Sequence, residues 1–313
     1  MPLFRYTAII ALLAAFITCE QFGCSQPFAT LSEIMPVCAA NGGLPVQMEF
    51  DRPFADCDGL VLRMDVFRPT SADQPTPAVV LLHGGFWTYG ERWFMHDWAV
   101  DLATQGYAAA SIDYRLLWQG GQYPAPVADV LAAVAHLREH AAELNIDPQR
   151  IALFGASAGA HLALLAGMAA DASIFDATWP PGQSASVTAI VDIYGPTDFT
   201  LDPQTAQPWQ LDLVANLLGG TADEQPQRYQ EASPASHARA DGPPVLILHG
   251  TADPIVPIAQ ARALRDALEA AGQACQYIEV PGASHFWGSA WTSPEVQQHR
   301  EAILQFLVAA FGP

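Results

Sequence analysis

The sequence predicts an α/β fold in which a mostly parallel central sheet carries helices on both faces. Short apolar runs rich in β-branched residues alternate along the chain with amphipathic stretches of helical periodicity. The runs 78–82 and 109–112 are apolar throughout, as expected of strands buried on both faces. Between them, 92–105 has the length of a crossover helix and ends before Gly106. These three elements therefore predict one βαβ unit.

The remaining segments continue this alternation and predict one domain over 46–313. The segment 61–67 alternates like a half-buried strand, and 127–144 has helical spacing that Asp147-Pro148 should close. Further strands are expected at 151–154, 187–194, 245–249 and 277–280, and further helices at 158–170, at 258–271 and from Ser293-Pro294 onwards.

Length and composition fit a large folded domain and exclude a nucleic-acid-binding surface. A chain of 313 residues that is 51% hydrophobic can bury a sizeable core. Its net charge of -19 comes from 32 acidic and 13 basic residues, whereas phosphate binding needs clustered Lys and Arg. We therefore expect no nucleic-acid partner, and the sequence leaves the oligomeric state open.

The first 25 residues have the pattern of a signal peptide. Arg5 precedes the apolar run 7–18, and small residues suit cleavage after Ser25. The run is too short to span a membrane comfortably. An uncleaved anchor and lipid attachment at Cys19 or Cys24 are the alternatives. We expect a secreted or periplasmic protein with no stable membrane span after cleavage.

Three cysteines remain after removal of this leader. Cys38 lies in the N-terminal extension 26–45, and Cys57 and Cys275 lie in the predicted domain. An odd number permits one disulfide and one free thiol in an oxidising compartment. We expect Cys38 to form a disulfide with Cys57. We expect Cys275 to be a small, buried apolar residue at the start of a strand.

The segment 199–240 breaks the alternation of strands and helices. It is rich in Pro and Gln and contains only short apolar pieces, which is the composition of an insertion. A small cap over the carboxyl edge of the sheet and an ordinary surface excursion both fit this composition.

Ser157 is the candidate nucleophile. It lies in Gly155-Ala156-Ser157-Ala158-Gly159, which follows a strand-like run and precedes a helix, as in the G-x-S-x-G nucleophile elbow. So sharp a turn needs residues with almost no side chain on both sides of the serine, and Gly155 and Gly159 meet that need.

A serine nucleophile requires a histidine base and an acid that orients it. In elbow enzymes the acid and then the base follow the serine along the chain, and Asp253 and His285 supply that order. Both follow predicted strands, at the sheet edge where open α/β sheets build their sites. Asp198 is the alternative acid, because it also follows a strand.

Other titratable residues near predicted strand ends have a structural interpretation. His161 lies four residues after Ser157 on the same predicted helix, so we expect it to pack or to form a hydrogen bond away from the tip of the turn. Asp113 and Arg115 follow another strand, and we expect them to form a structural ion pair that braces the floor of the site.

The oxyanion donors are expected at the N–H of Ala158 and in the loop His83-Gly84-Gly85-Phe86-Trp87. Gly84 and Gly85 let the backbone approach a substrate oxygen without an intervening Cβ. No metal and no other cofactor is expected, since the sequence contains no H-E-x-x-H motif, no Cys/His ligand spacing and no phosphate-binding P-loop.

The motifs along the chain form a specific set: His83 to Trp87, Ser111 to Arg115, Tyr123 to Pro126, Asp147 to Ile151, Gly155 to Ala163, and His249 to Asp253 with Val256-Pro257. In these residues the chain resembles the α/β-hydrolase carboxylesterases from about Val46 to the C-terminus. It is most similar to the exported bacterial branch that contains bifunctional feruloyl and acetyl xylan esterases and is related to hormone-sensitive-lipase-like enzymes.

The resemblance implies Ser157, Asp253 and His285 as the triad, with backbone donors at Gly84, Gly85 and Ala158. Where many hormone-sensitive-lipase-like relatives carry a third glycine, this chain has Phe86, so their acyl preferences need not transfer. The His-Gly-Gly-aromatic-Trp sequence is also similar to that of kynurenine formamidases.

We therefore expect a serine carboxylic-ester hydrolase that works through an acyl-enzyme on short-chain, acetyl or feruloyl-type esters. The ester is expected to be a small molecule or to be linked to a polysaccharide, with Phe86, Trp87 and Trp287 as candidate substrate-binding residues. An amide hydrolase of the formamidase or peptidase type is the first alternative. A non-catalytic binding module is the second.

Overall fold

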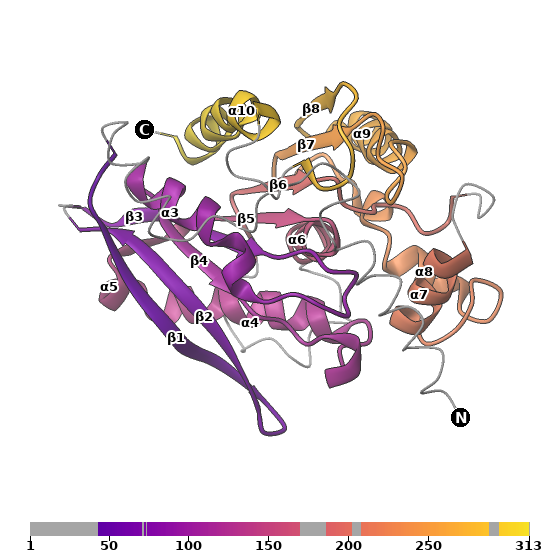
Figure 1. The fold of residues 1–313 in the computed structure, drawn as a ribbon, viewed down its shortest axis with the longest axis horizontal. Helices are drawn as coiled ribbons and strands as arrows, with labels where there is room; N and C mark the ends of the chain where they lie inside the picture. The colour runs from indigo at the N-terminus through magenta and orange to yellow at the C-terminus, as the bar shows by residue number, and fades with distance from the viewer. Residues whose placement is uncertain are drawn as a thin grey trace.

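Eight strands form one sheet in the order β1-β2-β4-β3-β5-β6-β7-β8 (Figure 1). The structure is a computed structural model that describes residues 43–70, 72, 74–169, 186–201, 208–287 and 294–312. The strands are β1 (Val46–Cys57), β2 (Leu60–Pro69), β3 (Thr76–Leu82), β4 (Ala108–Ile112), β5 (Ile146–Ala156), β6 (Ala189–Ile193), β7 (Val245–Gly250) and β8 (Cys275–Val280).

The sheet is parallel from β4 to β8, and β1 and β2 are added to it antiparallel. The register places Leu82 beside both Ile112 and Gly155, and Gly155 beside Asp192. The carboxyl ends of the central strands therefore meet at one edge, as the continuous apolar runs predict. The predicted fold class is confirmed.

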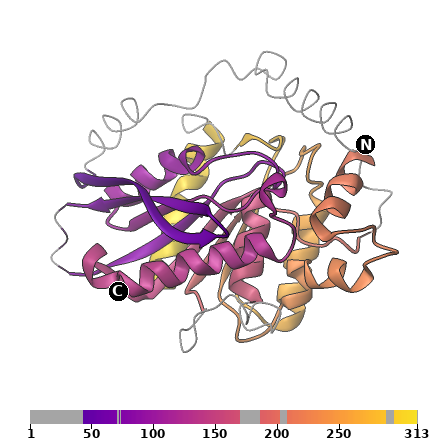
Figure 2. The same cartoon turned by 90° about the horizontal axis from the view of Figure 1, so that it is seen from below.

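Helices cover both faces of the sheet, as Figures 1 and 2 show. One face packs against α4 (Ala125–Glu139), α6 (Ala158–Met168) and α9 (Ala259–Ala271), and the other against α3 (His96–Thr104) and α10 (Pro294–Phe311). In β3, Val80 and Leu82 point into the first core and Val79 and Leu81 into the second. Each strand thus contributes alternate side chains to two hydrophobic cores.

Three local expectations are wrong. The predicted helix over 127–144 ends at Glu139, and a short helix α5 (Ala141–Leu144) follows it, while β5 begins before Pro148. The predicted helix over 92–105 starts as a 3-10 turn, Arg92–Met95. The edge strand β1 was not expected, because two register irregularities break its alternation of buried and exposed residues.

The insertion 199–240 is helical in its described part. It contains α7 (Pro208–Leu218), α8 (Pro226–Glu231) and a 3-10 turn at Pro234–His237. A backbone hydrogen bond connects the insertion to the rest of the domain: the N–H of Tyr123 donates to the carbonyl of Leu217 at 2.9 Å.

The expected leader and Cys38 lie outside the described residues. Cys57 is a free thiol in the structure, so the expected disulfide with Cys38 is not supported. The Cys57 thiol lies 3.8 Å from a carboxylate oxygen of Asp129, and Cys275 opens β8 as expected. Within the ranges given above, no helix combines the length and the apolar character that a bilayer crossing needs.

Candidate active site

Ser157 lies in the sharp turn between β5 and α6 with φ 53° and ψ −120°, a left-handed conformation that few non-glycine residues adopt. A Cβ on Gly155 would lie 2.3 Å from the carbonyl oxygen of Gly159. A Cβ on Gly159 would lie 2.3 Å from the carbonyl oxygen of Leu82. Both glycines are therefore required for the turn to close. The Ser157 side chain sits at the carboxyl edge of the sheet, and the residue is 8% exposed.

The structure brings Ser157, His285 and Asp253 into one hydrogen-bonded chain. Nε2 of His285 lies 2.9 Å from Oγ of Ser157, and Nδ1 of His285 lies 2.7 Å from Oδ2 of Asp253. Because a carboxylate can only accept, Nδ1 carries the proton and Nε2 accepts from the serine hydroxyl. This arrangement can transfer a proton from the hydroxyl to the imidazole.

The environment of Asp253 favours its charged form. Burial alone would raise its pKa, but hydrogen bonds from His249 and His285 and from the N–H of Ile255 hold the pKa well below its usual range. The N–H groups of Ile255 and Val256 donate to Oδ1 at 2.8 and 2.9 Å, which leaves Oδ2 for the histidines. Asp253 is thus available as a fixed carboxylate at any pH near neutrality.

The loop after β3 lies directly against Ser157. A Cβ on Gly84 would lie 3.2 Å from the Cβ of Ser157, and Gly85 has φ +129°. In the described part of the chain, the N–H groups of Gly84 and Gly85 have no hydrogen-bond acceptor, and Ala158 is the first residue of α6. The residues expected as oxyanion donors therefore surround the serine, and the Gly84 and Gly85 N–H groups are free to donate.

Aromatic residues connect this loop to the insertion. The rings of Phe86 and Trp209 on α7 are 5.6 Å apart, and those of Trp87 and Phe199 are 6.1 Å apart. Phe86 is half-buried, whereas Trp87 is only 4% exposed and belongs to the core. The insertion therefore packs on the loop 83–87 after β3, the candidate oxyanion loop, at the edge of the sheet where Ser157 lies.

Trp287 packs behind His285, with Tyr194 between them. It is 7% exposed, and its ring lies 6.0 Å from Tyr194, whose own ring lies 4.6 Å from His285. These contacts place Trp87 and Trp287 under the site rather than on its surface.

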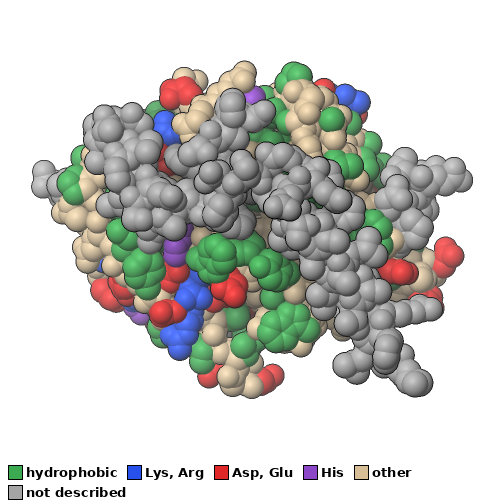
Figure 3. All heavy atoms as spheres, viewed as in Figure 1, with side chains coloured by type: hydrophobic (Ala, Val, Ile, Leu, Met, Phe, Trp, Pro, Cys, Tyr) green, Lys and Arg blue, Asp and Glu red, His purple; other side chains and the backbone are tan. Residues whose placement is uncertain are grey.

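Exposed aromatic side chains lie near the oxyanion loop. Tyr89 is 52% exposed and Trp118 is 72% exposed, and the indole N–H of Trp118 donates to the carbonyl of Thr88 at 3.1 Å. Figure 3 shows hydrophobic side chains beside acidic and basic ones on the face of the molecule that is seen in Figure 1. The surroundings of the site thus offer flat apolar surface to a ligand.

The alternative residues have structural roles. Asp198, the alternative acid, accepts hydrogen bonds from the N–H and hydroxyl of Thr200 at 2.8 and 2.6 Å. His161 is buried, and its Nε2 donates to the carbonyl of Ala232 at 2.8 Å, so the expectation of a hydrogen-bonding role is confirmed.

The expected ion pair between Asp113 and Arg115 is wrong. Asp113 pairs with Arg92 at 2.7 Å, and Arg115 pairs with Asp129 on α4 at 2.6 Å. The backbone N–H of Arg115 also donates to Asp129 at 2.8 Å, so the backbone and the guanidinium of Arg115 both bind the same carboxylate.

Sequence reasoning missed three buried residues around the site. Tyr114 stacks on His83 beneath the oxyanion loop, and His249 lies 3.3 Å from Asp253. Asp192 is fully buried on β6, which pairs with β7, the strand that carries His249. Their only signal in the sequence is a polar residue at or near the end of an apolar run.

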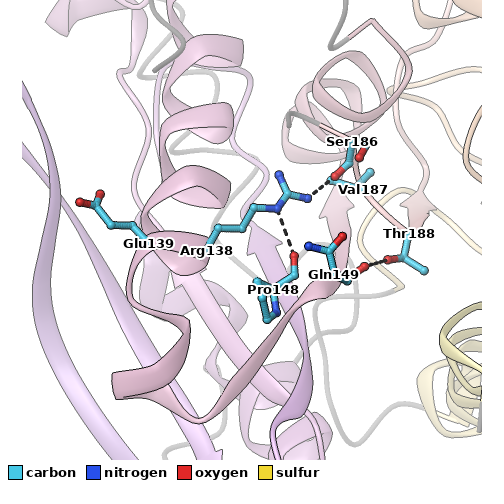
Figure 4. Close-up of a pocket in the computed structure, with 7 residues that line it drawn as sticks. All are labelled: Arg138, Glu139, Pro148, Gln149, Ser186, Val187 and Thr188. Atoms are coloured by element: carbon cyan, nitrogen blue, oxygen red, sulfur yellow. Dashed lines mark hydrogen bonds between the residues drawn. The ribbon is translucent and has the colours of Figure 1, made fainter. Parts of the chain in front are cut away.

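A surface depression among the described residues lies away from this site. It has a volume of about 510 Å³ and lies where β5 begins and just before β6, at the opposite edge of the sheet (Figure 4). Arg138 crosses it and donates to the carbonyls of Pro148 and Ser186. The other lining residues are Glu139, Gln149, Val187 and Thr188. This depression holds none of the candidate catalytic residues.

Comparison with known proteins agrees with this geometry. Residues 64–268 match the model of the BD-FAE family. The chain is 34% identical to the esterase LipC of Mycobacterium tuberculosis over 71% of its own length and 56% of that protein. It thus spans about half the length of this curated relative.

Two solved esterases have the same architecture. Esterase 2 of Thermogutta terrifontis gives a TM-score of 0.70 at 26% identity, over 85% of this chain and 92% of that one, and it has also been solved phosphonylated by sarin. A truncated carbohydrate esterase from gut microbiota gives a TM-score of 0.73 at 25% identity, over 84% and 96%.

Proposed function

Because the chain belongs to the BD-FAE family of α/β hydrolases, we propose that it is a serine carboxylesterase that works through an acyl-enzyme. The observation that carries this proposal is the hydrogen-bonded chain from Ser157 through His285 to Asp253, at 2.9 and 2.7 Å. A binding module would have no need of the left-handed conformation of Ser157, which costs energy to maintain.

In the proposed reaction, Oγ of Ser157 attacks the ester carbonyl carbon while Nε2 of His285 takes the hydroxyl proton. The carbonyl oxygen becomes an oxyanion that accepts hydrogen bonds from the N–H groups of Gly84, Gly85 and Ala158. The imidazolium, held by Asp253, then gives its proton to the departing alcohol. Water repeats the sequence on the acyl-enzyme, releases the carboxylic acid and restores the serine.

We further propose short-chain, acetyl or feruloyl-type esters as the substrate class. The exposed rings of Tyr89 and Trp118 support this, because flat apolar surface suits an aromatic acyl group or the face of a sugar. The similarity to a carbohydrate esterase points the same way. Polymer-linked esters would also fit the predicted export of the chain.

Hydrolysis of p-nitrophenyl acetate tests the activity. The wild type and the control Ser236→Ala, which changes an exposed serine, should turn the ester over at similar rates. Ser157→Ala should lose at least about 10³-fold in kcat, since it removes the nucleophile. Equal rates for all three proteins would refute a serine mechanism at Ser157.

Two further measurements complete the test. Mass spectrometry after treatment with paraoxon should show one covalent phosphoryl adduct on Ser157 and none in Ser157→Ala. A panel of acyl-chain lengths, methyl ferulate, acetylated xylan and N-formylkynurenine then defines the substrate. Turnover of N-formylkynurenine alone would favour the amide hydrolase over the esterase.

A further inference from the structure

His249, near the end of β7, lies directly behind the catalytic carboxylate. It is fully buried, and its Nε2 lies 2.7 Å from the carbonyl oxygen of Val256 and 3.3 Å from Oδ2 of Asp253. A carbonyl oxygen only accepts, so Nε2 must carry a proton, which it shares between the two oxygens. Oδ2 is also the atom that receives Nδ1–H of His285.

Asp192 lies on the neighbouring strand β6 and points to the same face of the sheet. The register pairs Asp192 with Ile247, two residues before His249, so both polar side chains lie on one face. Oδ1 of Asp192 accepts the N–H of Gly195 at 2.8 Å. A Cβ on Gly195 would lie 2.7 Å from that oxygen, so this approach requires glycine.

One polar atom on each of these two side chains lacks a partner. Among the described residues, Oδ2 of Asp192 and Nδ1 of His249 have no hydrogen bond, although both are buried. Leaving either atom unpaired in the interior is costly. Since the Nε2 proton of His249 is already fixed by Val256 and Asp253, Nδ1 of the neutral ring is an acceptor.

One proton on Asp192 would satisfy both atoms. A neutral carboxyl group can donate from Oδ2 to one bridging water that in turn donates to Nδ1 of His249, while Oδ1 keeps its bond to Gly195. Burial raises the pKa of Asp192 to about 7 against the opposing effects of Gly195 and His249, so the neutral acid is available near neutral pH. That proton would hold His249 in the tautomer that donates to Asp253.

We propose that Asp192 and His249 are positioning residues for Asp253, in a polar chain Asp192-His249-Asp253-His285-Ser157 that extends the catalytic machinery through the interior of the sheet. Asp192 fixes the tautomer of His249, and His249 fixes the direction in which Oδ2 of Asp253 faces His285. Neither residue contacts substrate. The inference rests on the proposed ester hydrolysis at Ser157 and deepens it.

Paired substitutions separate positioning from packing. At His249, Gln keeps an N–H donor near Asp253, whereas Leu has similar bulk and no donor. At Asp192, Asn places its oxygen at the Gly195 N–H and its NH₂ towards Nδ1, which imitates the neutral acid, whereas Leu does neither. Each variant is measured with p-nitrophenyl acetate for kcat and KM, and its folding is checked by thermal denaturation.

The expected loss is in kcat, because the change acts through Asp253 and not through substrate contacts. His249→Leu and Asp192→Leu should lower kcat about 10- to 100-fold, as expected for a lost hydrogen bond to a charged group, with KM changed less than about threefold. His249→Gln and Asp192→Asn should retain most of the activity. Folded Leu variants with wild-type kcat, or no recovery with Gln and Asn, would overturn the proposal.

Proton NMR provides a readout that does not depend on turnover. The Nδ1–H of His285, donated to Asp253 at 2.7 Å, should give a far-downfield resonance in the wild type and in Ser157→Ala. That resonance should shift or broaden in His249→Leu and stay in place in His249→Gln and Asp192→Asn. If the wild type lacks esterase activity, the proposed function fails, and this resonance still tests the polar chain. An unperturbed resonance in a folded His249→Leu variant, or a resonance lost in His249→Gln, overturns the inference, and the Gln variant keeps the test open where the Leu variant does not fold.

Discussion

The phenol ring of Tyr114 lies flat on the imidazole of His83, with ring centroids 4.4 Å apart, and its hydroxyl donates to the carbonyl oxygen of His83 at 2.8 Å. Burial lowers the pKa of His83 to about 4, so the ring is neutral. Its Nδ1–H donates to the carbonyl of Gly84 at 2.7 Å. Tyr114 therefore holds the residue that sets the direction of the oxyanion loop.

Replacement of Tyr114 by Phe should loosen this loop. The substitution leaves the buried carbonyl of His83 without the phenol donor, which should lower the free energy of unfolding by about 1–3 kcal/mol. We expect kcat for p-nitrophenyl acetate to fall several-fold with little change in KM. The matched control is Tyr107→Phe, because the Tyr107 hydroxyl has no hydrogen bond among the described residues. Equal effects at both positions would argue against a role for Tyr114 in the loop.

The two glycines of the oxyanion loop should respond differently to alanine. At Gly84 the new Cβ would lie 3.1 Å from the carbonyl oxygen of Ala156 and 3.2 Å from the Cβ of Ser157, which small shifts relieve. At Gly85 it would lie 1.9 Å from the carbonyl oxygen of Tyr89, at φ +129°. Gly84→Ala should therefore lower kcat about tenfold with a small change in Tm, because a shifted N–H loses about half of the roughly 3 kcal/mol that a well-aligned donor contributes.

Gly85→Ala should lower both kcat and Tm, because the backbone itself must move. Kinetics on p-nitrophenyl acetate and thermal denaturation distinguish the two cases. A Gly85→Ala variant with wild-type activity would contradict the close contact between Gly85 and Tyr89.

The sequence alone predicts where the three central residues of the site lie. Ser157, Asp253 and His285 each follow an apolar run, and parallel strands that are buried on both faces bring the ends of such runs to one edge. The spacing of Gly155 and Gly159 around the serine adds a steric requirement that few other turns share. These local signals need no knowledge of how the strands are ordered.

The supporting residues could not be predicted, because their roles depend on register. Asp192 and His249 face each other only through the pairing of β6 with β7, whose residues lie more than fifty positions apart. Likewise, Arg115 has its partner on α4 rather than next to it in the sequence. The edge strand β1 was missed because its bulges interrupt the period of two on which strand prediction depends.

Phe86 should limit the size of the acyl group. It is half-buried, two residues after Gly84, and its ring contacts Trp209 of the insertion at 5.6 Å. Phe86→Ala opens space in the loop whose Gly84 lies against Ser157, so kcat/KM for p-nitrophenyl butyrate relative to the acetate should rise about three- to tenfold. The control is Trp118→Ala, an exposed ring whose indole N–H donates to the carbonyl of Thr88 in the same loop. An unchanged ratio in Phe86→Ala would place the acyl group elsewhere.

Asp192 should make the stability of the protein fall as the pH rises from about 4 to about 7. Burial raises its pKa from 3.8 to about 7 in the folded state, so over this range the folded chain binds more protons than the unfolded chain. Stability then decreases with pH and becomes independent of this group above both pKa values. A shift of about three units corresponds to at most about 4 kcal/mol.

Asp192→Asn removes this titration while keeping the hydrogen bond to Gly195. The Tm of the variant minus that of the wild type should therefore be several degrees larger at pH 8 than at pH 5. The exposed Asp241, changed to Asn in the same way, should show no such difference, because its side chain is 89% accessible. A Tm difference at Asp192 that does not depend on pH would show that the carboxyl group is ionised in the folded protein at both pH values. The proton between Asp192 and His249 could then not come from Asp192.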